Sequence, residues 1–450
     1  MTIDNGQLTI ALEGLARAMQ SAGFTLYRVG GCVRDKLLGL PTHDTDVASA
    51  MRPEQLLSLC AEHGIKATLV NERLGTINCQ LSIVNCQLCV EHTTFRTESY
   101  GEGGAHKPIE VAFTDRLEED AFRRDFSVNA LYEDVLTGGI VDPTGGLADL
   151  DKKLLRTTTA DPAVILRDDG LRILRLTRLC AQLDFAPEEK TWAAAKEHVC
   201  LLKDIAWERK RLELSRILVG PRVLGGLRLL RDVGALPYVI PELAAAQGYP
   251  QKPEYHKYDV LEHSFHVCEA IAPELPLRLM ALLHDIGKPD CYKRNGNMYD
   301  HPRIGEALCR AALRRLTYDN DLIARVCFVV RNHMYDLSGQ AKTPTLRKRF
   351  ALWGRERAQD IITLREADVR GSGFDRAYTA TRWQNTLAAM EAEGVPFSEN
   401  ELAITGKDIM EALRLPPGPE VGRIKEKLFL HCAVKPRDNT RERLLQIVRS

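Results

Sequence analysis

Residues 26–47 read LYRVGGCVRDKLLGLPTHDTDV, and this stretch predicts a strand, a glycine turn, a short helix, a loop and a second strand. The apolar run Leu26–Val29 ends at the pair Gly30–Gly31, and a helical pattern then extends from Val33 to Leu38. Glycine has no Cβ atom, so a triphosphate can approach the backbone of this turn closely. The stretch therefore predicts a phosphate-binding turn between the strand and the short helix.

Two carboxylates, Asp44 and Asp46, follow this turn and lie directly before the apolar Val47. Because side chains alternate between the two faces of a strand, the carboxylates are expected on one face. They repel each other unless a cation lies between them, and Mg²⁺ binds one or two carboxylates together with substrate phosphates. Arg34 adds a guanidinium whose planar fork matches a phosphate. The pattern predicts a two-metal, magnesium-dependent nucleotidyl-transfer site.

Residues 30–46 match GGxVRDxLLGxxxxDxD, which resembles the signature of the class II tRNA nucleotidyltransferase and poly(A) polymerase family. An isolated Asp-x-Asp pair is common on protein surfaces, so the specificity lies in the complete string. The resemblance implies that Asp44 and Asp46 bind Mg²⁺ and catalyse the reaction. It also implies that Gly31 and Arg34 bind the phosphates of the incoming nucleotide.

A strand pattern leads to EHTTFR at residues 91–96, where the family carries a similar E-x-T-T-x-R. The resemblance implies that Glu91 is the third catalytic carboxylate of the two-metal site. A solvent-facing glutamate on an ordinary strand is the alternative for this residue.

Residues 117–130, LEEDAFRRDFSVNA, predict a helix that carries Arg123, Arg124 and Asp125. Charge runs are usually solvated helix faces, which is the alternative here. The pattern R-R-D-x-x-x-N, completed by Asn129, is nevertheless the second motif of the same family. The resemblance implies that Arg124 contacts triphosphate oxygens, and that Asp125 and Asn129 help to bind the ribose of an NTP.

Residues 168–172, DDGLR, open a predicted long helix on which Arg175 and Arg178 follow at intervals of three. The family carries Glu-Asp-x-x-Arg at this place, so Asp168 replaces the usual glutamate. The resemblance implies that this helix binds the nucleotide, with Arg175 and Arg178 beside the base. The segment 208–214, ERKRLEL, resembles a further family motif and predicts ion pairs within the same helical region.

Asp169 and Arg172 form a predicted pair that selects the base. An ionised Asp only accepts hydrogen bonds, and Arg only donates them. The Watson–Crick edges of cytosine and adenine offer an amino donor beside an acceptor nitrogen, whereas uracil and guanine offer the reverse. The pair therefore predicts selection of C and A without a nucleic-acid template. A salt bridge at the start of a helix is the alternative.

Residues 100–108, YGEGGAHKP, are glycine-rich and polar and predict a mobile loop. In the family this loop helps to switch the enzyme from adding C to adding A, and it tends to carry basic residues. Only His106 and Lys107 are present here, so an A-only or CC-only enzyme stays a rival. Poly(A) polymerase is the other rival, but its Gly-basic-basic-Phe run is not matched by RLGTI at residues 73–77.

A second set of histidines and aspartates extends from residue 255 to residue 368 and resembles an HD-type metal phosphohydrolase. Neutral imidazoles and carboxylates bind hard or borderline divalent metals. A bound metal would deliver hydroxide to a phosphate ester, and Lys288 is expected to meet the phosphate. A scaffold without activity is one alternative, and a chain that acts mainly on RNA ends or nucleotides through this module is another. The predicted ligands are His263, His284, Asp285, His301, His333 and Asp368.

The composition is that of a globular protein, with 450 residues, 44% of them hydrophobic, and enough length for about two to four domains. There are 61 basic and 61 acidic residues, so a nucleic acid would have to bind at local basic patches such as residues 423–450. The twelve cysteines lack disulfide or zinc spacing and are expected to be reduced thiols. Neither a secretory signal nor an apolar run of membrane-spanning length occurs, so we expect a cytoplasmic protein without membrane contact.

Together the motifs predict four regions, and the order of the elements predicts their fold. We expect a mixed α/β head at residues 1–150 and a helical neck at 151–250 that binds the base and RNA. An HD-like module at 251–375 and a helical tail at 376–450 that binds tRNA follow. The tail from Leu402 resembles one bacterial CCA-adding subgroup. The resemblance thus implies that the chain adds C, C and A to tRNA from CTP and ATP.

Overall fold

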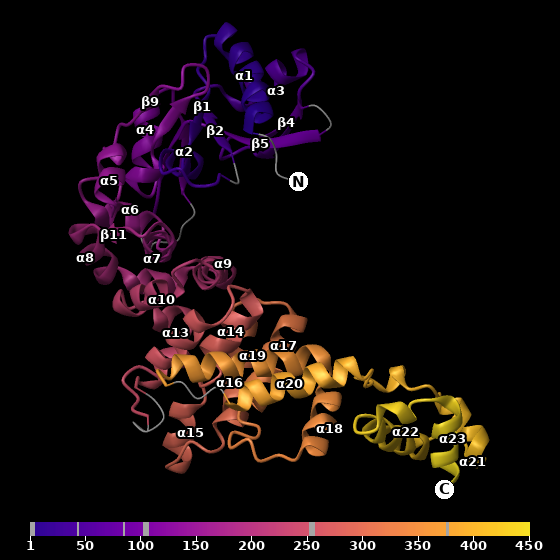
Figure 1. Ribbon diagram of the computed structural model, residues 1–450. Coiled ribbons are helices and arrows are strands. Elements are labelled where there is room, and N and C mark those ends of the chain that lie inside the picture. Colours follow the sequence, from indigo (N-terminus) through magenta and orange to yellow (C-terminus); the bar gives the residue numbers. More distant parts are fainter. Residues whose placement is uncertain (1–4, 43–44, 84–85, 102–107, 252–256, 375–377) are drawn as a thin grey trace. The chain divides into compact units, whose positions relative to one another are not determined.

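The computed structural model describes residues 5–42, 45–83, 86–101, 108–251, 257–374 and 378–450 (Figure 1). These residues form two compact units. The first comprises residues 1–217 and 229–239, and the second comprises residues 218–228 and 240–450. Within the described residues, no helix combines the length and the apolar character needed to cross a bilayer.

The first unit begins with a seven-stranded sheet whose strand order is β3-β4-β5-β2-β1-β8-β9. Strand β2 is parallel to β5, and the other neighbouring pairs are antiparallel, which confirms the predicted mixed sheet. The strands are β1 Tyr27–Val29, β2 Asp46–Ser49, β3 Lys66–Asn71, β4 Thr76–Ile83, β5 Cys86–Thr94, β8 Tyr132–Asp134 and β9 Ile140–Val141. A separate ribbon pairs β6 Arg96–Ser99 with β7 Glu110–Phe113.

Helices pack on both faces of this sheet, so its central strands are buried on both sides. On β2, Val47 points into a core formed with α1 (Asn5–Ser21) and α3 (Pro53–Glu62). Its neighbour Ala48 points into the opposite core, formed with Ala121 of α4 (Leu117–Phe122) and Tyr132 of β8. The short helix α2 (Gly31–Leu37) starts directly after β1, as the sequence predicts.

Two helix boundaries differ from the prediction. Helix α4 ends at Phe122, so Arg124 and Asp125 lie on the bend after the helix, where Asp125 accepts a hydrogen bond from the N–H of Phe126. The predicted helix at residues 168–172 is interrupted, because α6 (Pro162–Asp168) ends where it was expected to begin. Asp169 is extended, and its carboxylate accepts a hydrogen bond from the N–H of Leu171, the first residue of α7.

The remainder of the chain is largely helical, as expected from the sequence. In the neck, β10 (Leu154–Leu155) and β11 (Ala186–Pro187) form a short parallel pair. The helices that follow α4 are α5 Gly146–Lys152, α6, α7 Leu171–Leu183, α8 Glu189–Glu197, α9 Trp207–Leu218, α10 Val223–Asp232, α11 Leu236–Val239 and α12 Pro241–Ala244. The helices after these all lie in the second unit and are α13 Val260–Ala270, α14 Leu275–Leu283, α15 Lys288–Asn295, α16 His301–Arg315, α17 Asn320–Asn332, α18 Thr343–Trp353, α19 Arg355–Gly371, α20 Tyr378–Ala392, α21 Gly406–Leu413, α22 Pro419–Cys432 and α23 Arg441–Arg449.

Candidate functional site

Two carboxylates from neighbouring strands lie side by side in the head. The parallel pairing of β2 with β5 puts Asp46 in register with Glu91, and both residues are exposed. Adjacent strands are about 4.8 Å apart, so side chains at register positions can share one small cation. Carboxylate oxygens are the ligands that Mg²⁺ prefers, and this pair therefore fits the metal. Asp44 lies outside the residues that the structure describes.

The glycine turn before α2 runs next to two guanidinium groups. Gly30 has a φ of 82°, a left-handed conformation that favours glycine, and a Cβ atom there would lie 3.9 Å from Nη1 of Arg124. A Cβ atom on Gly31 would lie 3.4 Å from Nη2 of Arg34. The turn therefore brings bare backbone and two cations together, which suits a polyphosphate.

A chain of hydrogen bonds connects the head to the neck through the second motif. Arg34 donates to the side-chain oxygen of Asn129 at 2.5 Å, and the Asn129 amide donates to Asp125 at 3.1 Å. The other oxygen of Asp125 accepts hydrogen bonds from Arg175 of α7 at 2.8 and 2.6 Å. Burial alone would raise the pKa of Asp125, but the charges of Arg175 and Arg172 hold that pKa well below its usual range. Asp125 is therefore an ionised acceptor.

Arg124 is held by two residues that the sequence analysis did not assign to the site. Its guanidinium donates to Asp120 at 2.9 Å and to the hydroxyl of Tyr132 at 2.9 Å. Tyr132 in turn donates to Asp120 at 2.6 Å. The sequence predicts Asp120, four positions before Arg124, only as part of the start of a helix. Its spacing of one helical turn was the signal for this ion pair.

The predicted base-selecting residues bind different partners. Asp169 accepts a hydrogen bond from Arg209 at 2.7 Å, and the buried Arg172 donates to the backbone carbonyls of Ile165 and Arg123. Arg178 donates to Glu213 at 2.5 Å. These contacts confirm the ion pairs predicted for the segment 208–214. They also show that the carboxylate of Asp169 and the guanidinium of Arg172 are each held in place by other groups.

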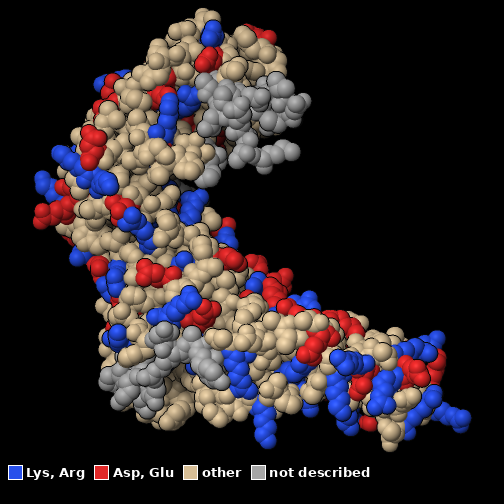
Figure 2. All heavy atoms as spheres, viewed as in Figure 1, with Lys and Arg blue, Asp and Glu red and all other residues tan. Residues whose placement is uncertain are grey.

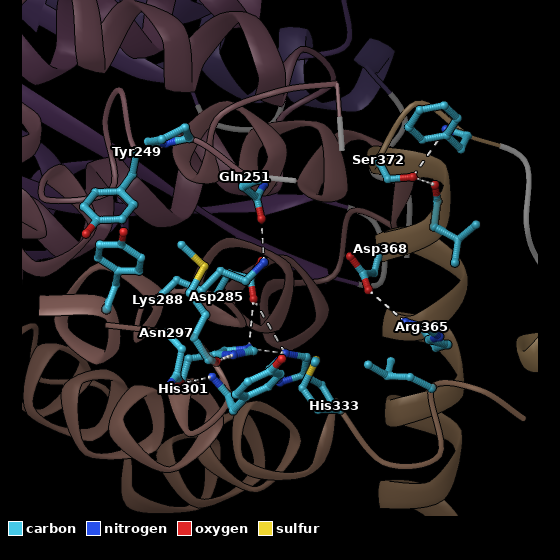
Figure 3. A pocket seen from close by; sticks show the side chains of 18 of the residues that line it. Tyr249, Gln251, Asp285, Lys288, Asn297, His301, His333, Arg365, Asp368 and Ser372 are labelled. Carbon is cyan, nitrogen blue, oxygen red and sulfur yellow. Dashed lines mark hydrogen bonds and ion pairs between the residues drawn. The ribbon is translucent and has the colours of Figure 1, made fainter. Parts of the chain in front are cut away.

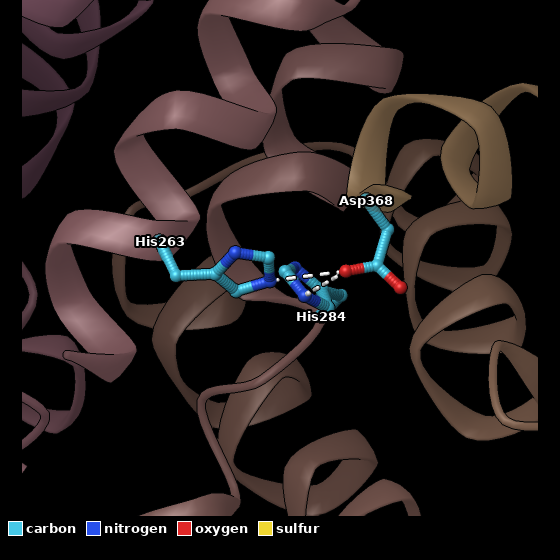
Figure 4. A group of neighbouring side chains, drawn as sticks. All are labelled: His263, His284 and Asp368. Atoms are coloured by element: carbon cyan, nitrogen blue, oxygen red, sulfur yellow. Dashed lines mark hydrogen bonds and ion pairs between the residues drawn. The ribbon is translucent and has the colours of Figure 1, made fainter. Parts of the chain in front are cut away.

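The six predicted HD ligands come together in the second unit as two groups of three. Within each group the ligand atoms lie within 4.8 Å of one another. In the first group Nε2 of His263 lies 3.0 Å from an Asp368 oxygen (Figure 4). The groups are His263, His284 and Asp368, and Asp285, His301 and His333.

Asp285 connects the two groups. One of its oxygens lies 3.2 Å from Nε2 of His284, and the other lies 3.2 Å from Nε2 of His301. Lys288 lies 2.5 Å from the first oxygen (Figure 3). Burial alone would raise the pKa of Asp285, but the neighbouring His284 ring and the charge of Lys288 hold that pKa well below its usual range. The carboxylate can therefore face two cations at once.

The histidine tautomers fit a metal centre. Nδ1 of His284, His301 and His333 lies 2.7–2.8 Å from a backbone carbonyl, which only accepts, so each Nδ1 carries the proton. Their Nε2 lone pairs consequently face the centre, as in metal-binding histidines. Nε2 of His301 and Nε2 of His333 are 3.1 Å apart, and two such lone pairs repel unless a cation lies between them. Buried Nε2 of His284 has no hydrogen-bond partner among the described residues.

A pocket with a volume of about 1040 Å³ opens beside this cluster (Figure 3). Arg365, one helical turn before Asp368 on α19, lines the pocket and donates to the outer oxygen of Asp368 at 3.2 Å. Lys288 also lines it and donates to Gln251 at 2.6 Å. The sequence predicts Lys288 as a group that meets a phosphate, whereas no motif marks Arg365. The spacing of three residues from Asp368 was its only signal.

Three family models match this chain, and together they cover most of it. Residues 26–156 match the poly A polymerase head domain, and residues 260–370 match the HD domain. Residues 184–247 match the model described as the probable RNA and SrmB-binding site of polymerase A.

Full-length relatives include enzymes of different specificity. An A-adding tRNA nucleotidyltransferase of Deinococcus radiodurans is 31% identical over 89% of each chain. A CC-adding tRNA nucleotidyltransferase of Thermus thermophilus is 33% identical over 92% of this chain and 91% of its own. The structure of the Bacillus stearothermophilus CCA-adding enzyme in complex with CTP matches with a TM-score of 0.72 at 25% identity, covering 100% of this chain and 97% of its own.

Proposed function

The chain belongs to the class II tRNA nucleotidyltransferase and poly(A) polymerase family and is a tRNA nucleotidyltransferase, and we propose that it adds C, C and A in turn. CTP and ATP are the proposed substrates, and no nucleic-acid template is needed. The observation that carries the proposal lies at the start of α7. The carboxylate of Asp169, an acceptor, is held by Arg209, and the guanidinium of Arg172, a donor, is held by the carbonyl of Ile165. This set suits cytosine and adenine alike. Similarity to a CCA-adding enzyme over the whole chain supports it.

The reaction begins when the 3′-hydroxyl of tRNA attacks the α-phosphate of the nucleotide, and it releases pyrophosphate. Mg²⁺ held by Asp46 and Glu91, together with Asp44, would activate the hydroxyl and neutralise phosphate charge. The protein's own cations, Arg124 and Arg34, bind phosphate oxygens. Both are held by hydrogen bonds before the nucleotide arrives, so little reorganisation is needed at the moment of reaction.

Asp125 is the proposed acceptor for a ribose hydroxyl. Its two oxygens accept four hydrogen bonds, two from Arg175 and one each from the Asn129 amide and the backbone N–H of Phe126. These donors fill the four lone-pair sites of a carboxylate, so a ribose hydroxyl would take the place of the uncharged Asn129 amide as donor. The 2′-hydroxyl of an NTP would supply that donor, and a dNTP would not.

The tail offers a surface for tRNA phosphates. Lys and Arg gather over α22 and α23 (Figure 2). Seven exposed side chains of this kind lie on the two helices and on the segment between them: Arg423, Lys427, Lys435, Arg437, Arg441, Arg443 and Arg449. Binding through such a surface releases counterions and weakens as salt is added. We expect these steps to take place in the cytoplasm.

The test is incubation with tRNA that lacks its 3′ end, with CTP and ATP supplied separately and together. Addition of two residues with CTP alone, and of three with both nucleotides, is the result expected of a CCA-adding enzyme. A product that stops after CC with both nucleotides would identify a CC-adding enzyme. Addition of A only to tRNA that already ends in CC would identify an A-adding enzyme, and long A tails would identify a poly(A) polymerase.

A second function is proposed for the HD cluster, namely metal-dependent hydrolysis of phosphoesters. The observation that favours it is the close approach of inward-facing Nε2 atoms around Asp285. A divalent metal held by the six ligands would supply hydroxide for attack on phosphorus. Lys288 and Arg365 lie at the pocket wall, where they can bind the phosphate oxygens. Assay of the metal-loaded protein with simple phosphoesters and 2′,3′-cyclic nucleotides tests this function.

A further inference from the structure

A polar face of the head sheet extends away from the carboxylate pair. Ile77 and Cys79 of β4 and Val90 of β5 lie in the core that α1 and α3 cover. Because side chains alternate along a strand, Asn78 and Glu91 point to the other face. Among the described residues, the core on that other face takes no side chain from β3 or β4. The sheet beside Glu91 is therefore open to a ligand.

The strand register arranges the polar side chains of this face in two rows. Asn78 is directly opposite Glu91, and Thr68 of β3 is directly opposite Asn78. In the next row, Gln80 is opposite Lys66, the first residue of β3. Thr68 and Lys66 are exposed, whereas Asn78 and Gln80 are half-buried. Amide, hydroxyl and ammonium groups thus extend from the carboxylate to the edge strand of the sheet.

The strand order decides from which side the attacking hydroxyl approaches. The nucleotide phosphates are proposed to bind at the glycine turn after β1 and at Arg34 and Arg124. In an in-line displacement the attacking and leaving oxygens lie on opposite sides of the phosphorus. Pyrophosphate leaves on the side of β1, so in the order β3-β4-β5-β2-β1 the attacking hydroxyl lies on the side of β5 and β4 (Figure 1). The 3′ end of the acceptor RNA consequently lies over the polar face beside Glu91.

We propose that this face is the subsite for the terminal nucleotide of the acceptor RNA, with the amide of Asn78 at its 2′-hydroxyl and Lys66 at its 5′ phosphate. The carbon that carries the 2′-hydroxyl is bonded to the carbon that carries the attacking 3′-hydroxyl. Asn78 lies one strand spacing, about 4.8 Å, from Glu91, so its amide can reach this neighbouring hydroxyl. An amide offers a donor and an acceptor, and both match a hydroxyl. The proposal rests on the metal-binding roles proposed for Asp46 and Glu91.

The subsite gives the chain a way to recognise its acceptor as RNA at the reacting end. A 2′-hydroxyl is the group that distinguishes RNA from DNA at a given site. Lys66 lies two strands and two residues away from Glu91, and its long side chain carries a charge suited to a backbone phosphate.

Single-turnover addition to two acceptors tests the contact of Asn78. The acceptors are tRNAs that end at the discriminator base, one with ribose and one with 2′-deoxyribose at that last nucleotide. Wild type, Asn78→Ala and Gln20→Ala are compared at saturating CTP, or with ATP on tRNA that ends in CC if the chain adds only A. Gln20 is an exposed amide residue of α1, which packs on the opposite face of the sheet, so its variant is the matched control.

The expected result is a ratio of rates that disappears in one variant only. A hydrogen bond between uncharged groups corresponds to a factor of about 2 to 12. Wild type and Gln20→Ala should be slower by such a factor on the deoxy acceptor, whereas Asn78→Ala should add to both acceptors at the same reduced rate. A wild type that does not distinguish the acceptors would overturn the proposal. Equal slowing of both acceptors by Asn78→Ala would also overturn it, because the amide would then act on Glu91 rather than on the ribose.

Two further variants separate the subsite from its premise. Lys66→Gln should reduce the salt slope of acceptor binding by about 1, because one phosphate contact is lost, and should leave the KM for CTP unchanged. An unchanged salt slope would refute the phosphate contact. A normal rate of addition in Glu91→Ala would remove the metal site on which the subsite rests. Loss of rate in Glu91→Ala, with the wild-type ratio kept in Asn78→Ala, would refute the subsite alone.

Discussion

Asp125 of the head accepts two hydrogen bonds from Arg175 of the neck, at 2.8 and 2.6 Å. The carboxylate is buried, so this pair connects a proposed nucleotide-binding group to a helix 50 residues further along the chain. The contact thus makes the position of the second motif depend on the neck.

Arg175→Ala should lower both nucleotide addition and stability. Removal of one partner leaves the buried carboxylate of Asp125 without its charged donors, which costs about 2 kcal/mol of unfolding free energy. Urea denaturation measures this loss. Arg17→Ala breaks an exposed pair with Glu13 in the same unit and should change stability by less than about 0.5 kcal/mol. Equal effects of the two substitutions would contradict the structural role of Arg175.

Asp44→Ala and Asp46→Ala should each abolish nucleotide addition, and Glu91→Ala should reduce it. Loss of a metal ligand removes several kcal/mol of charge stabilisation, which corresponds to at least about a hundredfold in rate. Single-turnover incorporation of CTP measures the rate, and thermal melting shows that the fold is intact. Glu110→Ala, an exposed strand carboxylate, is the control. Near-normal rates in both aspartate variants would refute the two-metal assignment.

Arg209→Ala should weaken base selection, although Arg209 is not among the residues proposed to contact the nucleotide. Arg209 holds the Asp169 carboxylate at 2.7 Å, and without it the acceptor is free to turn away. We expect Asp169→Ala and Arg172→Ala to lose discrimination worth about 1–3 kcal/mol, and Arg209→Ala to lose part of it. A four-nucleotide competition on tRNA that ends at the discriminator base measures the effect. Wild-type selectivity for C and A in all three variants would move base selection elsewhere, with Arg178 and Arg175 as the next candidates.

His284→Ala combined with Asp285→Ala should abolish metal binding by the HD cluster and leave nucleotide addition to tRNA intact. Both residues are buried ligands, and Asp285 connects the two groups of three. Mass spectrometry of the purified protein measures bound metal. A melting temperature that rises on addition of a divalent metal to the wild type, but not to the variant, supports the assignment. Unchanged metal content in the variant would argue against it.

Acid should destabilise the first unit through Asp120. Burial alone would raise the pKa of this carboxyl, but Arg124 and Arg123 hold it well below its usual range. Since the folded pKa lies below the unfolded value, the stabilisation is complete above about pH 5 and is lost as the pH falls towards 2. Asp120→Asn should therefore be less stable at pH 7 and show a flatter dependence of unfolding free energy on pH. Asp115→Asn, an exposed control, should retain the wild-type pH dependence.

Local patterns predicted β1, the glycine turn, α2 and β2 of the head, because the turn and the alternation on β2 depend on near neighbours. The positions of Arg124 and Asp125 after α4 were not predicted. There, the hydrogen bond of Arg124 to Tyr132, eight residues on, and that of Asp125 to Arg175, 50 residues on, outweigh the helical propensity of a charged run. The break at Asp169 has a similar origin, since its carboxylate caps α7 and binds Arg209.

Residue type and order predicted the six HD ligands. They did not predict the backbone carbonyls beside the histidine rings or the contact of Arg365 with Asp368. Whether Nε2 or Nδ1 faces the centre depends on the backbone carbonyl beside each ring, and a sequence does not reveal it. Arg365 had only its spacing from Asp368 as a signal.

The parallel pairing of β2 with β5 has a consequence for folding. Parallel neighbours cannot be joined by a tight turn, so Asp46 and Glu91 come together only when β5, which also pairs with β4, docks on β2. Contacts of this sequence separation form slowly compared with helices. We therefore expect Asp46 and Glu91 to come together late in folding. The time at which magnesium affinity returns during refolding should then show when the central sheet has formed.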